Sequence, residues 1–71
     1  MDGKTTDDLV KIAAAGGGFR ISAARPVNDL VRIAAAAANG GAKIIIAKAA
    51  AVQTMDLVRI ASAGKGRVFF E

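Results

Sequence analysis

Three segments of the chain repeat one order of polar and hydrophobic residues. The hexapeptide Asp-Leu-Val-Lys/Arg-Ile-Ala occupies residues 8–13, 29–34 and 56–61, and only lysine and arginine exchange between the copies. In the first copy Leu9, Ile12 and Ala13 are three and four positions apart, so a helix would bring them onto one face. The other copies keep this spacing. The pattern predicts three amphipathic helices, near residues 6–15, 26–38 and 54–63.

The residues that flank these segments agree with helix boundaries. Thr5 offers a hydroxyl cap to the first helix, Pro26 suits the first position of the second, and Thr54 is a candidate cap for the third. Glycine permits the left-handed conformation that ends many helices, and it follows each segment. The predicted helix ends lie at Gly16–Gly18, Gly40–Gly41 and Gly64.

A short stretch of strand-forming residues follows each glycine turn, at 19–22, 43–46 and 67–70. The alternation of helix and strand favours parallel strands joined by helical crossovers. We predict an α/β fold of one domain with three repeats, about 5–24, 26–49 and 53–71. The repeats form a small, mostly parallel three-stranded sheet with helices mainly on one face. Antiparallel pairing and exchange of a unit between chains stay open as alternatives.

Alternation along the strands predicts which side chains each face of the sheet carries. Right-handed crossovers place the second and third helices on one face and leave the other uncovered. The covered face is expected to carry Phe19, Ile21, Ile44, Ile46, Val68 and Phe70. The uncovered face is expected to carry Arg20, Ser22, Lys43, Ile45, Arg67, Phe69 and Glu71.

The short length of the chain and its lack of cysteine and histidine argue against several classes of function. A chain of 71 residues and 7.2 kDa buries only about 60% of its surface as a monomer. Because it has no cysteine and no histidine, we expect no disulfide, no zinc or haem site, no cofactor and no thiol or histidine-dependent catalysis. Oligomerisation is then the remaining means of stabilising so small a chain.

We therefore expect a non-enzymatic module that acts as a self-associating scaffold or protein-interaction domain, with a homodimer as its simplest form. Ile45, Phe69 and Phe70 are the expected contact residues. The near-identical repeats, 17 alanines and absence of tryptophan and tyrosine are typical of designed or consensus-derived proteins. A small natural module is the alternative origin.

Charge supports a second hypothesis. The formal net charge is +4, which favours weak attraction to phosphate polymers. Arg20, Lys43 and Arg67 around Phe69 would form a basic sheet face with an aromatic side chain, which suits nucleic-acid binding. Arg25, close to a predicted helix start, is a further candidate anion contact.

Each hexapeptide also carries an acid and a base three positions apart. We expect Asp8/Lys11, Asp29/Arg32 and Asp56/Arg59 to form ion pairs within their helices. In the alternative, the three basic residues form a row that tracks a phosphate backbone, although the aspartates would partly neutralise it.

The segment Thr5–Gly18 resembles the first helix and glycine loop of the repeats in TAL-effector DNA-binding proteins. Here the chain continues as a predicted strand, where those repeats continue as a second helix. We interpret the likeness as convergence on a good helix C-terminus and transfer no base-reading residue.

No uncharged run approaches the roughly 20 residues of a membrane-spanning helix, and residues 1–4 do not resemble the start of a secretory signal. We expect a cytoplasmic protein without a membrane partner.

Overall fold

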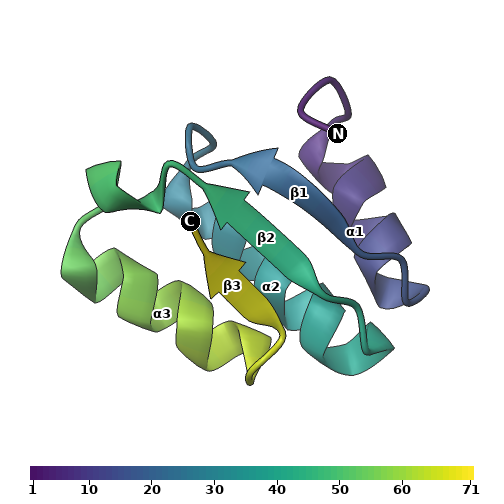
Figure 1. Cartoon of the computed structure of the whole chain (residues 1–71). Helices are drawn as coiled ribbons and strands as arrows, with labels where there is room; N and C mark the ends of the chain where they lie inside the picture. Colours follow the sequence, from purple (N-terminus) through teal and green to yellow (C-terminus); the bar gives the residue numbers. More distant parts are fainter.

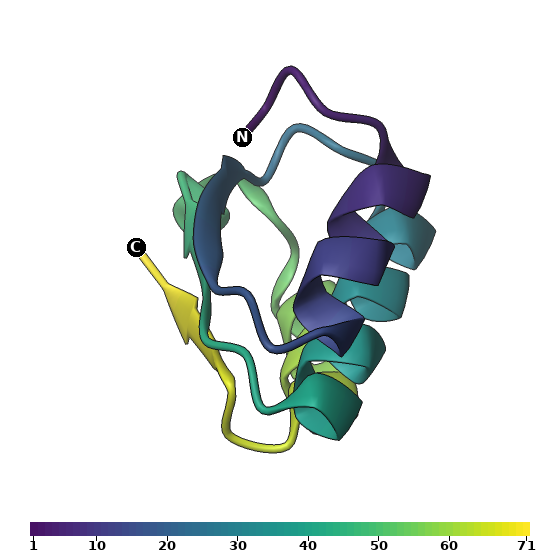
Figure 2. The same cartoon turned by 90° about the vertical axis from the view of Figure 1, so that its right-hand side faces the viewer.

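Helices and strands alternate along the chain. A computed structural model describes all 71 residues. The elements are α1 (Thr6–Ala14), β1 (Phe19–Ser22), α2 (Val27–Gly40), β2 (Ile44–Ala47), a short 3₁₀ helix η1 (Ala49–Ala51), α3 (Thr54–Gly64) and β3 (Val68–Phe70). They form two layers, with the sheet on one side and the three α-helices on the other (Figures 1 and 2).

The sheet is parallel throughout, and its strands follow the order of the sequence, β1-β2-β3. Ile44 of β2 lies between Phe19 and Val68, and Ile45 lies between Arg20 and Phe69. The predicted α/β fold is confirmed, and the antiparallel alternative is wrong. All three α-helices cover the same face, and the opposite face carries no α-helix (Figure 2).

The core lies between the two layers. Its largest fully buried side chains come from all three repeats: Leu9, Ile21, Leu30, Ile33, Ile44, Ile46 and Ile60. Alanines of α2, Ala34 and Ala37 among them, are also fully covered and let the helices approach one another closely. Burial of Ile21, Ile44 and Ile46 agrees with the alternation predicted for the covered face of the sheet.

Helix ends differ from the prediction in three details. Pro26 is the N-cap residue of α2 instead of its first helical residue, and Gln53 precedes α3 while Thr54 lies inside it. Gly64 is the last residue of α3, and the left-handed cap is Lys65, with a φ of 49°. Gly64 has another role, because a Cβ there would overlap the side chain of Val68.

Candidate interaction surface

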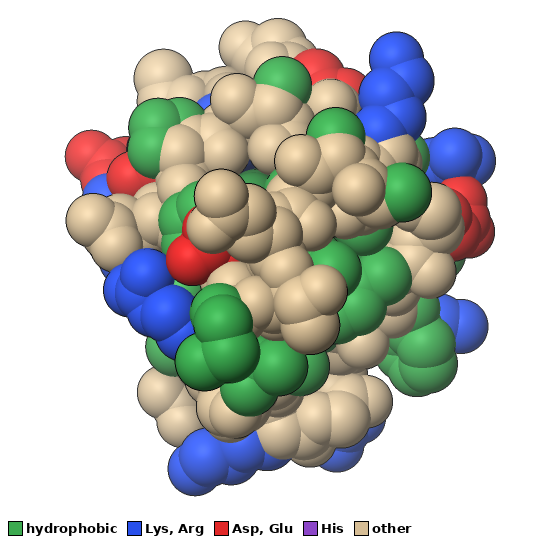
Figure 3. Space-filling view, turned by 90° about the vertical axis from the view of Figure 1, so that its left-hand side faces the viewer, with side chains coloured by type: hydrophobic (Ala, Val, Ile, Leu, Met, Phe, Trp, Pro, Cys, Tyr) green, Lys and Arg blue, Asp and Glu red, His purple; other side chains and the backbone are tan.

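Large hydrophobic side chains are exposed mainly in the last repeat. Met55 and Val58 of α3 are 71% and 50% exposed, and Phe69 and Phe70 of β3 are 47% and 36% exposed. Met1 is the one other large hydrophobic side chain of this kind. Figure 3 shows this side of the molecule, where hydrophobic side chains lie among polar and charged ones. We call the surface formed by Met55, Val58, Phe69 and Phe70 the α3–β3 end.

At two positions the first two repeats bury residues whose counterparts in the last repeat are more exposed. Ile21 and Ile46, which share a register row with Phe70, are each only 1% exposed. Leu9 and Leu30 are fully buried, whereas Leu57 at the same point of the third hexapeptide is only partly covered. α2 packs against both α1 and α3, and α3 has no helix on its far side (Figure 1). The α3–β3 end is therefore the surface on which a further repeat would pack.

The outer edge of β3 has backbone groups without hydrogen-bond partners. The N–H of Ile44 donates to the Arg67 carbonyl, and the N–H of Glu71 donates to the Ile46 carbonyl, each at 2.9 Å. Because alternate residues of a strand bond to the same neighbour, Val68 and Phe70 direct their N–H and C=O groups away from the sheet. β3 thus has a free edge.

The opposite edge of the sheet is partly protected. The N–H of Ser22 in β1 donates to Asp2 Oδ1 at 2.8 Å, so the N-terminal segment occupies the position that a further strand would need. The two ends of the array therefore differ. One carries exposed hydrophobic side chains and a free edge, and the other carries a capped edge.

The uncovered face of the sheet carries both hydrophobic and charged side chains. Ile45 and Phe69 lie side by side on β2 and β3, and Lys43 Nζ stands 4.8 Å from the centroid of the Phe69 ring. Arg20 forms an ion pair with Glu71 at 3.0 Å. Of the predicted basic residues, Arg20 and Lys43 have contacts on this face, where Arg20 forms an ion pair with a carboxylate and Lys43 contacts an aromatic ring. Alternation along the strand assigns Arg67 to the same face.

Phe70 is separated from the other two predicted contact residues. It pairs in register with Ile46 and so shares the helix-covered face of the sheet, at its outer edge. Phe69 and Phe70 therefore lie on opposite sides of one edge strand. The structure brings Ile45 and Phe69 together and places Phe70 around the edge from them.

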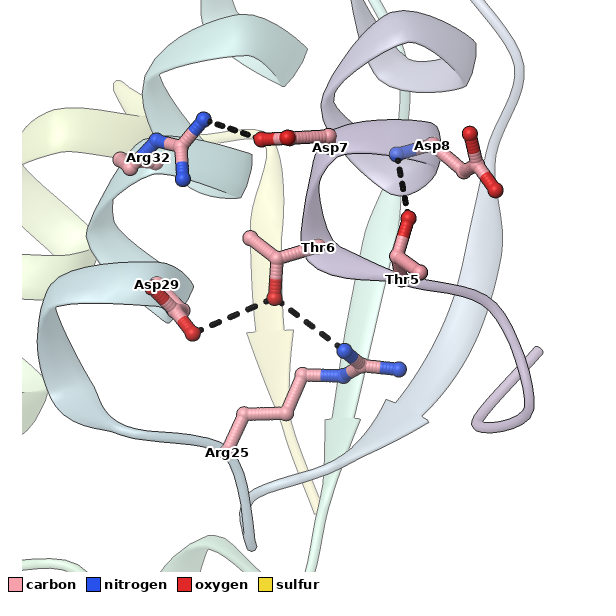
Figure 4. Close-up of polar contacts among 7 residues, drawn as sticks. All are labelled: Thr5, Thr6, Asp7, Asp8, Arg25, Asp29 and Arg32. Atoms are coloured by element: carbon pink, nitrogen blue, oxygen red, sulfur yellow. Dashed lines mark hydrogen bonds and ion pairs between the residues drawn. The ribbon is translucent and has the colours of Figure 1, made fainter.

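Arg25 lies away from this face and binds within the chain. Its Nη1 donates to Thr6 Oγ1 at 3.2 Å (Figure 4), and its Nη2 donates to the carbonyls of Lys4 at 2.6 Å and Asp2 at 3.0 Å. These bonds hold the N-terminal segment against the connection between β1 and α2. A shallow, open hollow beside it is lined by Asp2, Ser22, Ala24 and Arg25.

Two of the three repeated bases bind the neighbouring helix. Arg32 of α2 donates to Asp7 of α1 at 2.8 Å (Figure 4), and Arg59 of α3 donates to Asn28 of α2 at 3.2 Å. Asp7 and Asn28 are equivalent residues of successive repeats, so the array repeats its polar contacts as well as its core. The hydrogen bond and charge of Arg32 lower the pKa of Asp7, and the same bond raises the pKa of Arg32.

Two of the three predicted intrahelical ion pairs are wrong. Only Asp56 and Arg59 approach each other, at 3.8 Å. Asp29 instead accepts a hydrogen bond from Thr6 Oγ1 at 3.2 Å (Figure 4). Packing of the helices brings closer partners to Asp29 and Arg32 than their own helix offers.

Comparison with known proteins found no matching family model, curated protein or solved structure. None of the helices combines the length and hydrophobicity needed to cross a bilayer. No group of three or more aspartates and glutamates lies close enough together to hold a metal ion.

Proposed function

We propose that this chain is a non-enzymatic α/β repeat module that associates with copies of itself through its α3–β3 end. One observation carries the proposal: four of the five exposed large hydrophobic side chains, Met55, Val58, Phe69 and Phe70, belong to α3 and β3 at that end. Burial of apolar surface contributes about 25 cal/mol per Å², and contiguous exposed patches mark contact surfaces. Ile45 borders Phe69 and extends the surface onto the uncovered face.

Removing the aromatic side chains tests this proposal. The double variant Phe69→Ser/Phe70→Ser is expected to sediment as a monomer under conditions where the parent chain is a dimer. Lys11→Ser is the matched control, because Lys11 is exposed on α1 at the opposite end of the array, and it should leave the mass unchanged. A double variant that stays folded and dimeric would contradict the proposal.

Ile45→Asp probes the border of the surface. It would place a carboxylate beside Phe69, where association would have to desolvate it, and we expect at least a tenfold weaker dimer. Sedimentation velocity over a concentration series measures the change.

Nucleic-acid binding is the second candidate function, favoured by the position of Lys43 Nζ over the Phe69 ring on the uncovered face. A cation and an aromatic ring on a sheet suit the backbone and bases of a single strand. If this function holds, the triple variant Arg20→Ser/Lys43→Ser/Arg67→Ser loses salt-dependent affinity for a fluorescent oligonucleotide. Under the self-association proposal the parent chain has no such affinity to lose.

A further inference from the structure

The α3–β3 end carries a strand edge that is suited to one particular partner. Val68 and Phe70 present free backbone donors and acceptors, and an exposed edge of this kind is a template for another strand. A second copy of the chain brings the same edge. The opposite end of the array, formed by α1 and β1, is a poorer partner. There the Ser22 N–H already donates to Asp2, and Met1 is the one large exposed hydrophobic side chain.

Two like edges meet about a two-fold axis, which makes the strands antiparallel. The backbone groups of Val68 and Phe70 can both form hydrogen bonds across the interface only if Val68 of one copy faces Phe70 of the other. This register puts Phe69 on the axis, opposite its own counterpart. Each copy then contributes the N–H and C=O groups of two residues to the shared ladder.

The same register also pairs the charges. Arg67 of one copy falls opposite Glu71 of the other, two residues beyond Phe69 on either side of the axis. Alternation along the strand assigns Arg67, Phe69 and Glu71 to the uncovered face, where Glu71 reaches Arg20 at 3.0 Å. Opposite charges and aromatic pairs placed across strands stabilise a sheet. Moving the register by two residues would bring Phe69 opposite Arg67 or Glu71 and would separate the charges.

We propose that two copies of the chain join by antiparallel pairing of their β3 strands, with Val68 opposite Phe70 and Arg67 opposite Glu71, to give one continuous six-stranded sheet. The proposal depends on the self-association proposed above and specifies its geometry.

A single cysteine tests the position of the axis in this cysteine-free chain. In the dimer of Phe69→Cys, the Cα atoms of the two cysteines would lie about 4.5 Å apart. This distance allows a disulfide to form. Mild oxidation should therefore yield a covalent dimer. The matched control is Ile45→Cys on the neighbouring strand, whose two copies would lie about 14 Å apart, too far for a disulfide.

Charge reversal tests the register without removing Phe69. Arg67→Glu and Glu71→Arg should each weaken the homodimer about tenfold, because two facing pairs per dimer become repulsive. An equimolar mixture of the two variants restores every pair, so the heterodimer should form with at least the parent affinity.

The outcomes separate this inference from the function on which it depends. A parent dimer in which Phe69→Cys gives no crosslink and the mixed charge variants show no recovery would overturn the β3 pairing and leave self-association standing. A parent chain that stays monomeric at every concentration would overturn both.

Discussion

Glycine 40 shows how a single residue sets the distance between two helices. It is the last residue of α2, and a Cβ added there would collide with the carbonyl oxygens of Ala13 and Ala14 in α1. Gly41 follows as a left-handed cap with a φ of 78°. The sequence predicts a helix end at this pair, but it does not show the close approach, because the backbone that Gly40 meets belongs to the preceding repeat.

Gly40→Ala is expected to lower the free energy of unfolding by about 2 kcal/mol or more, because one of the two helices must move away. Gly3→Ala is the control, since nothing lies within 4 Å of the added methyl group, and we expect a change within about 0.5 kcal/mol. Urea unfolding followed by circular dichroism measures both. Equal stabilities of the two variants would refute the close packing at Gly40.

At the scale of elements, the sequence predicts more of the fold than of the contacts between helices. The repeated apolar spacing is a local property, so it identifies all three helices, and alternation identifies the faces of the sheet. The partner of Arg32 depends on how α2 crosses α1, which no single segment encodes, and so its bond to Asp7 was not predicted. The internal bonds of Arg25 escaped prediction for the same reason, because they join it to residues about twenty positions away.

The Asp7–Arg32 contact between α1 and α2 predicts a pH dependence of stability. Because Arg32 lowers the pKa of Asp7, folding favours the ionised carboxylate. Its contribution is complete above the unfolded pKa, at roughly pH 4, and is lost as the pH falls through the lower folded pKa. Asp7→Asn should therefore be less stable than the parent at neutral pH and equally stable in strong acid.

Urea unfolding at a series of pH values measures this difference. Asp8→Asn is the control, because Asp8 lies in the same helical turn and forms no ion pair. A deficit of Asp7→Asn that is the same at every pH would mean that the side chain acts through packing or capping instead of charge.

The 71 residues form a short repeat array whose two ends differ. Each repeat buries its hydrophobic residues against the next, and terminal repeats of such arrays usually need a polar outer surface. α1 and the N-terminal segment meet this need at one end, where Asp2 also caps the strand edge. The last repeat keeps Val58 and Phe70 exposed, whereas the equivalent residues of the second repeat, Val31 and Ile46, are partly and fully covered.

The sequence predicts only some of the exposed hydrophobic residues of the last repeat. Ile45, Phe69 and Phe70 are identifiable from the strand pattern alone. Met55 and Val58 were missed, because Val58 repeats Val10 and Val31 in the hexapeptide, and these are partly covered. Only the position of a repeat in the array determines which copy stays exposed.

The absolute mass of the parent chain in solution is the most direct test of the central claim that the α3–β3 end is closed by self-association. Light scattering after gel filtration, over a dilution series at low and high salt, gives this mass. The account predicts a species of about 14 kDa, twice the 7.2 kDa of one chain, which persists at high salt because apolar burial dominates the contact. A folded chain that stays at 7.2 kDa at every concentration would contradict it.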